Sequence, residues 1–250
     1  MTDHPRERPV KRRGHQTRLD RALFFLSRAL RRLAAGHVHL YRYYLVAQPV
    51  PRRPLLSSKR GRDIEVRRVD AGEAVLQQFP RPGDVLANRF RQGAVCYAAF
   101  RDNGLSGFLW FVPGNYEEDE VRCLYRPWPS GRGAWDFDVY VTPEDRVGLT
   151  FSRLWDTAYA DMRSRGVTWS MSRISAFNQG SLAAHARLGA RFLGSLTFLV
   201  IGRSQVMVGG RFPFVHIGFR VTSRPVVDVV APAESVIDAD NKKGEVASDA

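Results

Sequence analysis

The apolar positions of this chain follow two periods, which predict where helices and strands lie. Leucines recur every four and three residues from Leu19 to Leu33 with arginines between them, and this spacing is typical of an amphipathic helix. Thr17 with Asp20 can cap its start and Gly36 its end. Alternating apolar and polar residues predict strands at 37–47, 63–69, 94–101, 105–112, 121–126, 134–141, 167–174, 192–202 and 205–208. Further helices are predicted at 72–78, 84–92, between Pro143 and Gly166, and at 180–188.

The order of these elements predicts a mixed α/β fold. The turn from Asp102 to Gly104 joins two apolar strands as a hairpin. A long helix separates the strand at 134–141 from the strand at 167–174, and a helical crossover of this kind joins parallel neighbours. We therefore expect a layer of mixed strand direction, preceded by an N-terminal helix-strand extension.

Charge is distributed unevenly along the chain. Residues 1–62 hold 16 Lys/Arg and 3 Asp/Glu, so they account for the whole net charge of +13, and residues 63–250 are neutral overall. A dense positive field attracts nucleic acid, anionic lipid or an acidic partner. We predict a disordered basic leader at 1–16, an amphipathic helix, strand and Pro-rich linker at 17–62, a folded domain at 63–222, and a disordered acidic tail at 223–250.

Several features favour a cytoplasmic location. Cys96 and Cys123 are the only two cysteines, which suits a reducing compartment. No apolar run approaches the roughly 18 residues expected of a membrane span. The segment 21–30 is interrupted by Arg28 and lacks a cleavage site, so it is a poor signal peptide. The amphipathic helix leaves open a peripheral position at the inner membrane surface.

Two local patterns can carry binding chemistry. The turn at 146–151 combines Arg146 with the free N–H groups of a helix N-terminus, a ready site for phosphates. Asn178 follows a strand, where it can bind an amide-rich ligand or cap the next helix. The sequence has no Gly-rich Lys-Ser/Thr loop, no Cys-x-x-Cys and no His-x-x-x-His, so we expect no metal.

These two patterns resemble motifs of the GNAT acyltransferase superfamily, over about residues 63–208. The family's V-x-P-x-x-R is matched by Val141, Pro143 and Arg146, with Gly148 after it. Its N-x-x-A-x-x-x-Y-x-K-x-G-F is matched from Asn178, with Ser181, His185, Arg187 and Gly189 at the small, tyrosine, lysine and glycine positions. The two motifs are about 35 residues apart, with the expected helix and strand between them.

The resemblance implies a GNAT-like mixed central sheet with splayed parallel strands that admit an acyl-CoA, most often acetyl-CoA, as co-substrate. The residues it implies for binding are Val139, Val141, Arg146, Val147, Gly148, Leu149, Thr150 and Asn178. One departure bears on this site: aligned on Arg146, Leu149 and Phe151 stand where the family's turn has small residues. The alternative is that these bulky side chains crowd the pyrophosphate and weaken or alter CoA binding.

Candidate catalytic groups lie on both motifs. His185 stands where the family has a tyrosine that protonates the leaving thiolate, and its alternative role is a satisfied helix-surface residue. Asp136 and Asp138 share one face of a predicted strand, where each raises the other's pKa and favours one as general base. Solvation or pairing with arginines is the alternative. Glu117 and Glu118 are further candidates that could select a cationic acceptor.

The sequence therefore favours an acyl-CoA-dependent acyltransferase, most often an N-acetyltransferase, that transfers directly to a small-molecule or macromolecular amine. The alternative is a catalytically degenerate fold that serves as a binding module, with the basic N-terminal arm docked on nucleic acid or an anionic membrane surface. A third hypothesis is an acyltransferase for an envelope sugar or lipid, with the helix at Leu19 to Leu33 resting on the membrane.

Overall fold

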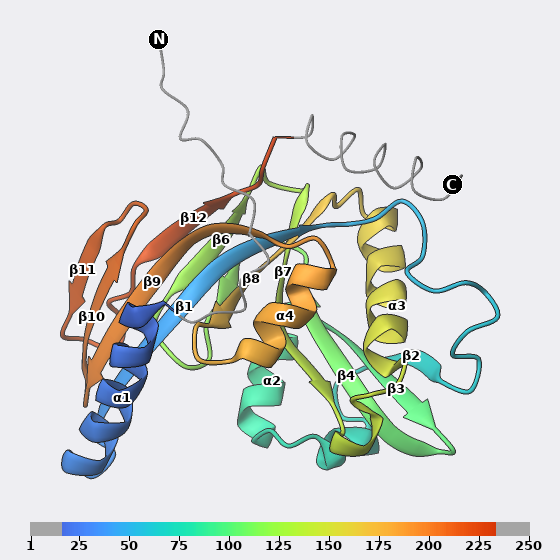
Figure 1. The fold of residues 1–250 in the computed structure, drawn as a ribbon, viewed down its shortest axis with the longest axis horizontal. Coiled ribbons are helices and arrows are strands. Elements are labelled where there is room, and N and C mark those ends of the chain that lie inside the picture. Colours follow the sequence, from blue (N-terminus) through green and yellow to red (C-terminus); the bar gives the residue numbers. More distant parts are fainter. Residues whose placement is uncertain (1–16, 234–250) are drawn as a thin grey trace.

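The computed structural model describes residues 17–233, which form one large and one small β-sheet with four α-helices (Figure 1). In chain order the helical elements are α1 (Arg18–Leu33), η1 (Ala74–Gln78), α2 (Gly83–Arg91), η2 (Pro143–Asp145), α3 (Thr150–Ser164) and α4 (Gln179–Arg187). The strands are β1 (Val38–Pro49), β2 (Glu65–Val69), β3 (Val95–Arg101), β4 (Gly104–Val112), β5 (Tyr116–Glu117), β6 (Leu124–Trp128), β7 (Gly133–Val141), β8 (Trp169–Ser175), β9 (Arg191–Ile201), β10 (Ser204–Gly209), β11 (Val215–Gly218) and β12 (Val226–Val230).

The large sheet confirms the predicted fold class. Its strand order is β11-β10-β9-β1-β8-β7-β4-β3-β2, and its pairs are antiparallel except β7 with β8, which α3 joins by a crossover. That parallel ladder holds only three residue pairs, from Gly133 with Trp169 to Trp135 with Met171. Beyond them the two strands run on without pairing to each other. The mixed sheet with a splayed parallel pair, which the GNAT resemblance implies, is therefore present.

The N-terminal strand β1 lies inside the sheet. It pairs antiparallel with β8 on one side and with β9 on the other. The strand predicted for the N-terminal extension is thus the direct neighbour of one splayed strand. Its position brings Gln48 next to an element that lies more than a hundred residues further along the chain.

The helix α1 lies across β1, with the cap predicted from the sequence. Thr17 and Asp20 form a reciprocal capping box at its start. The Asp20 carboxylate is buried and accepts a bond of 2.8 Å from Arg42 of β1, which fixes the helix on the sheet. Within residues 17–233, none of the helices has the length and apolar character needed to cross a membrane.

The C-terminal segment corrects one prediction. Disorder was expected from residue 223, yet Val226–Val230 form β12, which pairs parallel with β6 in the small sheet. Val227 and Val229 are fully buried there, so burial of one apolar face of the strand outweighs the acidic composition. The predicted leader at 1–16 and the last part of the predicted tail, 234–250, lie outside the described residues.

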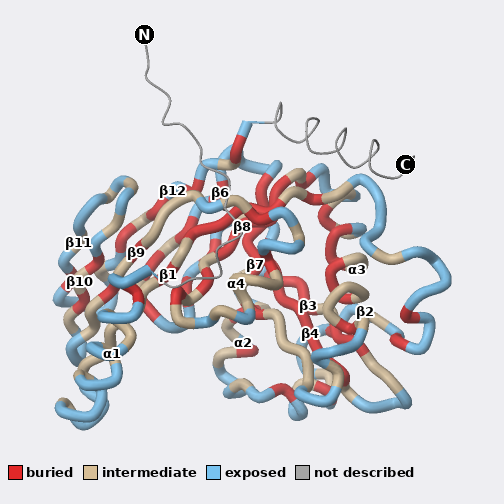
Figure 2. The backbone as a smooth tube through the Cα atoms, in the orientation of Figure 1, coloured by how far each residue is buried: buried red, intermediate tan, exposed pale blue. Residues whose placement is uncertain are grey.

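Two apolar clusters stabilise the two faces of the large sheet. Buried residues are concentrated in its central strands and in α3 (Figure 2). One face carries Trp110 and Trp135, with Tyr125 of the small sheet stacked on Trp135 at 4.4 Å. The other face packs against α3 through Leu154 and Trp155, which are fully buried. The core therefore runs along both sides of the point where β7 and β8 separate.

Gly107 permits the close approach of β4, β7 and α3. A Cβ at this position would lie 2.5 Å from the Tyr140 carbonyl oxygen and 3.3 Å from Cγ2 of Thr150. We expect Gly107→Ala to lower the free energy of unfolding by about 1–3 kcal/mol, because the backbone must shift to admit the methyl group. Urea unfolding would measure this. Gly104→Ala in the same strand is the control, since its Cβ would meet only ordinary contacts, and an equal loss there would contradict the steric argument.

Candidate functional site

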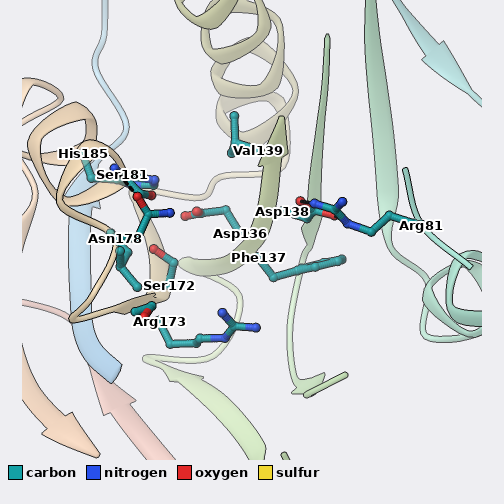
Figure 3. A pocket seen from close by; sticks show the side chains of 12 residues that line it. Arg81, Asp136, Phe137, Asp138, Val139, Ser172, Arg173, Asn178, Ser181 and His185 are labelled. Atoms are coloured by element: carbon teal, nitrogen blue, oxygen red, sulfur yellow. Dashed lines mark hydrogen bonds and ion pairs between the residues drawn. The ribbon is translucent and has the colours of Figure 1, made fainter. Parts of the chain in front are cut away.

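A cavity of about 210 Å³ opens where β7 and β8 stop pairing (Figure 3). Its walls come from the two splayed strands, the segment before α2, and the start and end of α4. The residues that line it are Arg81, Asp136, Phe137, Asp138, Val139, Ser172, Arg173, Ile174, Ser175, Asn178, Ser181 and His185. The structure thus brings together all three predicted catalytic residues, together with Val139 and Asn178 of the predicted binding set.

A β-bulge separates the two candidate bases. Trp110 of β4 pairs with Asp138 and Phe111 pairs with Asp136, so Phe137 is the extra residue. The prediction that Asp136 and Asp138 share one face is therefore wrong: Figure 3 shows their side chains leaving β7 in opposite directions. The strict two-residue alternation assumed for this strand fails because one residue is inserted in the ladder.

Asp136 is the carboxylate with the more perturbed environment. It is 2% exposed and accepts a 2.6 Å hydrogen bond from the hydroxyl of Ser170 on β8. Burial raises the pKa of Asp136 to about 7, against the opposing effect of serine hydroxyls. The pKa is raised as predicted, but the cause is desolvation and not repulsion from Asp138. A carboxyl group with this pKa can accept a proton near neutral pH.

Asp138 is instead part of an ion-pair cluster. Arg81 holds both of its carboxylate oxygens at 2.7 Å, and Arg89 approaches one of them at 2.7 Å. Arg89 also pairs with Asp119. Two guanidinium groups occupy the oxygens of this carboxylate, so Asp138 serves as the shared partner of two arginines. The geometry therefore supports the alternative for Asp138, in which its carboxylate pairs with arginines.

His185 is a buried residue in the last turn of α4. It is 4% exposed, and its Nδ1 lies 2.9 Å from Oε1 of Gln48 on β1. Since the amide oxygen can only accept, Nδ1 donates and the ring's Nε2 keeps its lone pair. Burial lowers the pKa of His185 to about 4. A charged imidazole at neutral pH therefore does not fit this environment. The burial also contradicts the helix-surface alternative. Protonation of the leaving thiolate by way of a water bound to His185 stays a prediction.

The Gln48 contact can be tested by exchanging its amide for a carboxylate. We expect Gln48→Glu to raise the pKa of His185, because a buried anion bonded to Nδ1 stabilises the imidazolium form. An NMR titration of the imidazole carbons would follow it. Gln48→Met, which removes the acceptor without adding charge, is the matched control. Equal titration curves for the Glu and Met variants would contradict the contact.

Asn178 caps the helix α4, which is one of the two roles expected for it from the sequence. Its Oδ1 accepts a 3.0 Å bond from the backbone N–H of Ser181, at the start of α4. The residue also lines the cavity, and Figure 3 shows it beside Ser172 and Asp136. Because the cap uses only the oxygen, the amide N–H groups are available for a ligand, so capping and binding are compatible.

The predicted phosphate turn follows directly from the free end of β7. The helix α3 begins at Thr150 without a side-chain cap, which leaves first-turn N–H groups open to an anion. Leu149 and Phe151 pack toward the core cluster of α3, with the Phe151 and Trp155 rings 6.3 Å apart. Phe151 is absent from the lining of the cavity, as are Val141, Arg146, Val147, Gly148, Leu149 and Thr150 of the predicted binding set.

Glu117 and Glu118, in the acidic segment before β6, form ion pairs within the protein. The side chain of Glu118 is fully buried and holds Arg173 of β8 through two bonds, at 2.8 and 2.5 Å. Glu117 is half exposed and pairs with Arg224. Because Glu118 is already neutralised, it offers no free charge for a cationic acceptor. Its partner Arg173 also lines the cavity, 4.6 Å over the ring of Tyr43.

Sequence reasoning missed the partners that tune this site. Ser170 lies on a predicted strand and Gln48 lies one residue beyond another, but their contacts with Asp136 and His185 cross between strands or span more than half of the chain. The alternation of β8 marks Ser170 and Ser172 as one face, which is the only local signal. Within residues 17–233, no three His, Cys, Asp or Glu side chains group as they would around a metal ion.

Comparisons with known proteins give distant structural neighbours. No protein-family model matches the sequence, and the search of curated proteins gives no match. One neighbour is a functionally unknown conserved protein from Staphylococcus epidermidis, with 13% identity, a TM-score of 0.42 and coverage of 69% of this chain and 66% of that one. A putative GNAT-family acetyltransferase from Novosphingobium aromaticivorans has 15% identity, a TM-score of 0.42 and coverage of 64% and 65%.

A third neighbour is a GNAT-family acetyltransferase from Elizabethkingia anophelis, described with acetyl-CoA bound. It has 10% identity and a TM-score of 0.39, and the match covers 50% of this chain and 74% of that one. The likeness is thus confined to part of each chain.

Proposed function

We propose that the protein is an acyl-CoA-dependent acyltransferase that uses acetyl-CoA as its main donor and transfers the acyl group directly to an amine. The observation that carries this proposal is the short β7–β8 ladder, which ends at Trp135 and opens a cavity beside a carboxyl group whose pKa is about 7. Backbone groups of β7 beyond the ladder are released from pairing with β8. An extended, amide-bearing pantetheine arm can bind such groups as an added strand does.

The proposed anion site is the start of α3. Its first turn has no side-chain cap, so its N–H groups would be donors for the pyrophosphate, and Arg146 would add a formal charge. Leu149 and Phe151 pack toward the core. This supports an open phosphate turn over one in which their side chains crowd the pyrophosphate. Val139, Val141 and Asn178 are proposed for the pantetheine arm, and Val147, Gly148 and Thr150 for the phosphates.

Asp136 is the proposed general base. An acceptor amine is protonated near neutral pH, so one proton must leave it before nitrogen can attack the thioester carbonyl. Asp136 takes this proton, backbone N–H groups near Val139 stabilise the oxyanion, and the thiolate leaves as CoA after protonation. The nitrogen that has attacked gives its second proton to the departing thiolate through a water, and His185, whose Nδ1 donates to Gln48, is proposed to position that water by accepting a hydrogen bond at Nε2. No bond to the protein forms at any step.

Calorimetric titration tests the binding half of the proposal. We expect acetyl-CoA to bind, and Arg146→Glu to weaken its affinity about tenfold or more, because a repulsive charge replaces an attractive one. Arg91→Glu, an exposed position on α2, is the matched control. Absence of heat with acetyl-CoA and with longer acyl-CoAs would favour the binding module instead.

Steady-state kinetics tests the transfer half. Direct transfer requires both substrates on the protein at once, so double-reciprocal plots should intersect. Parallel lines together with an isolable acyl-protein would show a covalent intermediate and contradict direct transfer.

A further inference from the structure

The exposed apolar side chains gather at the β11 end of the molecule. Of the seventeen large ones within residues 17–233, four lie on α1 and eight lie in residues 201–221, around β10 and β11. Phe212, Phe214 and Phe219 are each more than 60% exposed. Figure 2 shows both segments largely in the colour of exposed residues. Apolar patches of this kind on a folded domain mark interaction sites.

The strand register places α1 and this patch on the same face of the sheet. Val208 of β10 pairs with Val215 of β11 on one side and with Thr197 of β9 on the other. Thr197 in turn pairs with Arg42 of β1, the residue that binds Asp20 of α1. Directly paired residues point to the same side of a sheet. The face that α1 covers over β1 therefore continues uncovered over β10 and β11.

The same two segments are strongly basic. The helix α1 carries Arg18, Arg21, Arg28, Arg31 and Arg32, and its single acidic residue, Asp20, is buried against Arg42. Residues 201–221 hold Arg203, Arg211 and Arg220 and no Asp or Glu. The surface thus combines exposed aromatic and aliphatic side chains with eight arginines.

We propose that α1 together with β10–β11 forms a docking surface for an anionic lipid bilayer. A bilayer with anionic headgroups takes up apolar side chains at its acyl boundary and attracts arginines at its surface, which matches both properties at once. A second copy of the chain would bring the same eight arginines together, which like-charge repulsion opposes. Nucleic acid would neutralise the arginines but leave the exposed apolar residues in water. This proposal stands whether or not the protein is an acyltransferase.

Co-flotation of the full chain with vesicles tests the surface. We expect the protein to float with vesicles of phosphatidylcholine mixed with phosphatidylglycerol, but not with phosphatidylcholine alone, and to release at high salt. Replacing Arg28, Arg31 and Arg32 together by Glu should lower the partition coefficient on the order of a hundredfold. Phe214→Ser combined with Ile217→Ser should lower it about tenfold or more.

Matched controls separate this surface from overall charge. Arg52, Arg53 and Arg60 are exposed in the linker after β1, and their joint replacement by Glu changes the net charge equally. Leu55→Ser with Trp128→Ser is the apolar control, because both side chains are exposed outside the patch. Both control proteins should float like the wild type, with thermal melting confirming that every variant is folded.

Three outcomes would overturn the proposal. The first is equal loss of flotation in the linker variant and the α1 variant, which would assign binding to net charge alone. The second is wild-type flotation of both patch variants. The third is no flotation with anionic vesicles. A dimer in sedimentation that Phe214→Ser with Ile217→Ser dissociates would then assign the surface to a second copy of the chain. Nucleic-acid binding in a gel shift would assign it to nucleic acid. Flotation needs neither acyl-CoA nor turnover, so its failure is separable from failure of the proposed activity.

Discussion

Asp136→Asn is expected to lower kcat/KM for acyl transfer by about 10²- to 10⁴-fold, the usual contribution of a general base. The amide keeps the shape of the carboxyl group and can still accept from Ser170, but it cannot take a proton. For the wild type, kcat/KM should rise about tenfold per pH unit up to the pKa of Asp136, about 7, and level off above it. In Asp136→Asn this dependence should disappear.

The same substitution should stabilise the protein at high pH. Burial raises the pKa of Asp136 from its ordinary value of 3.8 to about 7, so the folded state holds this proton more tightly than the unfolded chain. The resulting stability is fully present below pH 3.8 and is lost as the pH rises through about 7. Asp136→Asn has no such proton to lose. At pH 8 its free energy of unfolding should exceed that of the wild type by about 2–4 kcal/mol.

Two variants serve as controls for this pair of effects. Asp138→Asn removes a partner of Arg81 and Arg89, so it should destabilise the fold at pH 8, the opposite sign to Asp136→Asn. Ser170→Ala removes a hydrogen bond to the charged carboxylate and should raise the pKa of Asp136, which moves the acidic limb of the rate profile to higher pH. A rate that falls with Asp138→Asn alone would assign the base to Asp138.

The fold was predictable where the sequence signal is local. The capped helix at Thr17, the hairpin at Asp102 and the crossover between β7 and β8 each leave a pattern within a few residues, because capping, turn chemistry and apolar period act over that range. The five residues Val226–Val230 include four valines, which favour a strand, yet the acidic composition around them favoured disorder. Composition averages over a window, whereas pairing with β6 depends on one buried face.

The sequence indicated only some of the residues around the cavity. Asp136, Asn178 and His185 line it, whereas Val141 and the predicted phosphate turn from Arg146 to Thr150 do not. The bulge at Phe137 depends on how β4 pairs with β7, and the Gln48 bond joins residues 137 positions apart in the chain. Neither leaves a mark in the local pattern. Protonation state follows from such distant contacts and from burial, so the roles of the two predicted carboxylates could be separated only with coordinates.

Glu118→Gln is expected to give the largest loss of stability, about 3–5 kcal/mol, because it leaves Arg173, whose side chain is only 15% exposed, without its main counter-charge. Glu120, whose side chain is half exposed, is the other carboxylate on Arg173, at 2.9 Å. Thermal melting should show a fall of more than about 6 °C. Glu117→Gln is the control next in sequence: it breaks only an exposed pair with Arg224 and should cost less than about 1 kcal/mol.

A double replacement distinguishes an uncompensated charge from general damage to the loop. Replacing Glu118 by Leu and Arg173 by Met removes both charges while keeping apolar volume, and such exchanges of buried pairs are often neutral in stability. The double variant should therefore melt well above Glu118→Gln. If instead it melts as low or lower, the loop needs the carboxylate for its own bonds to the N–H groups of Asp119 and Glu120, and the charge argument is wrong.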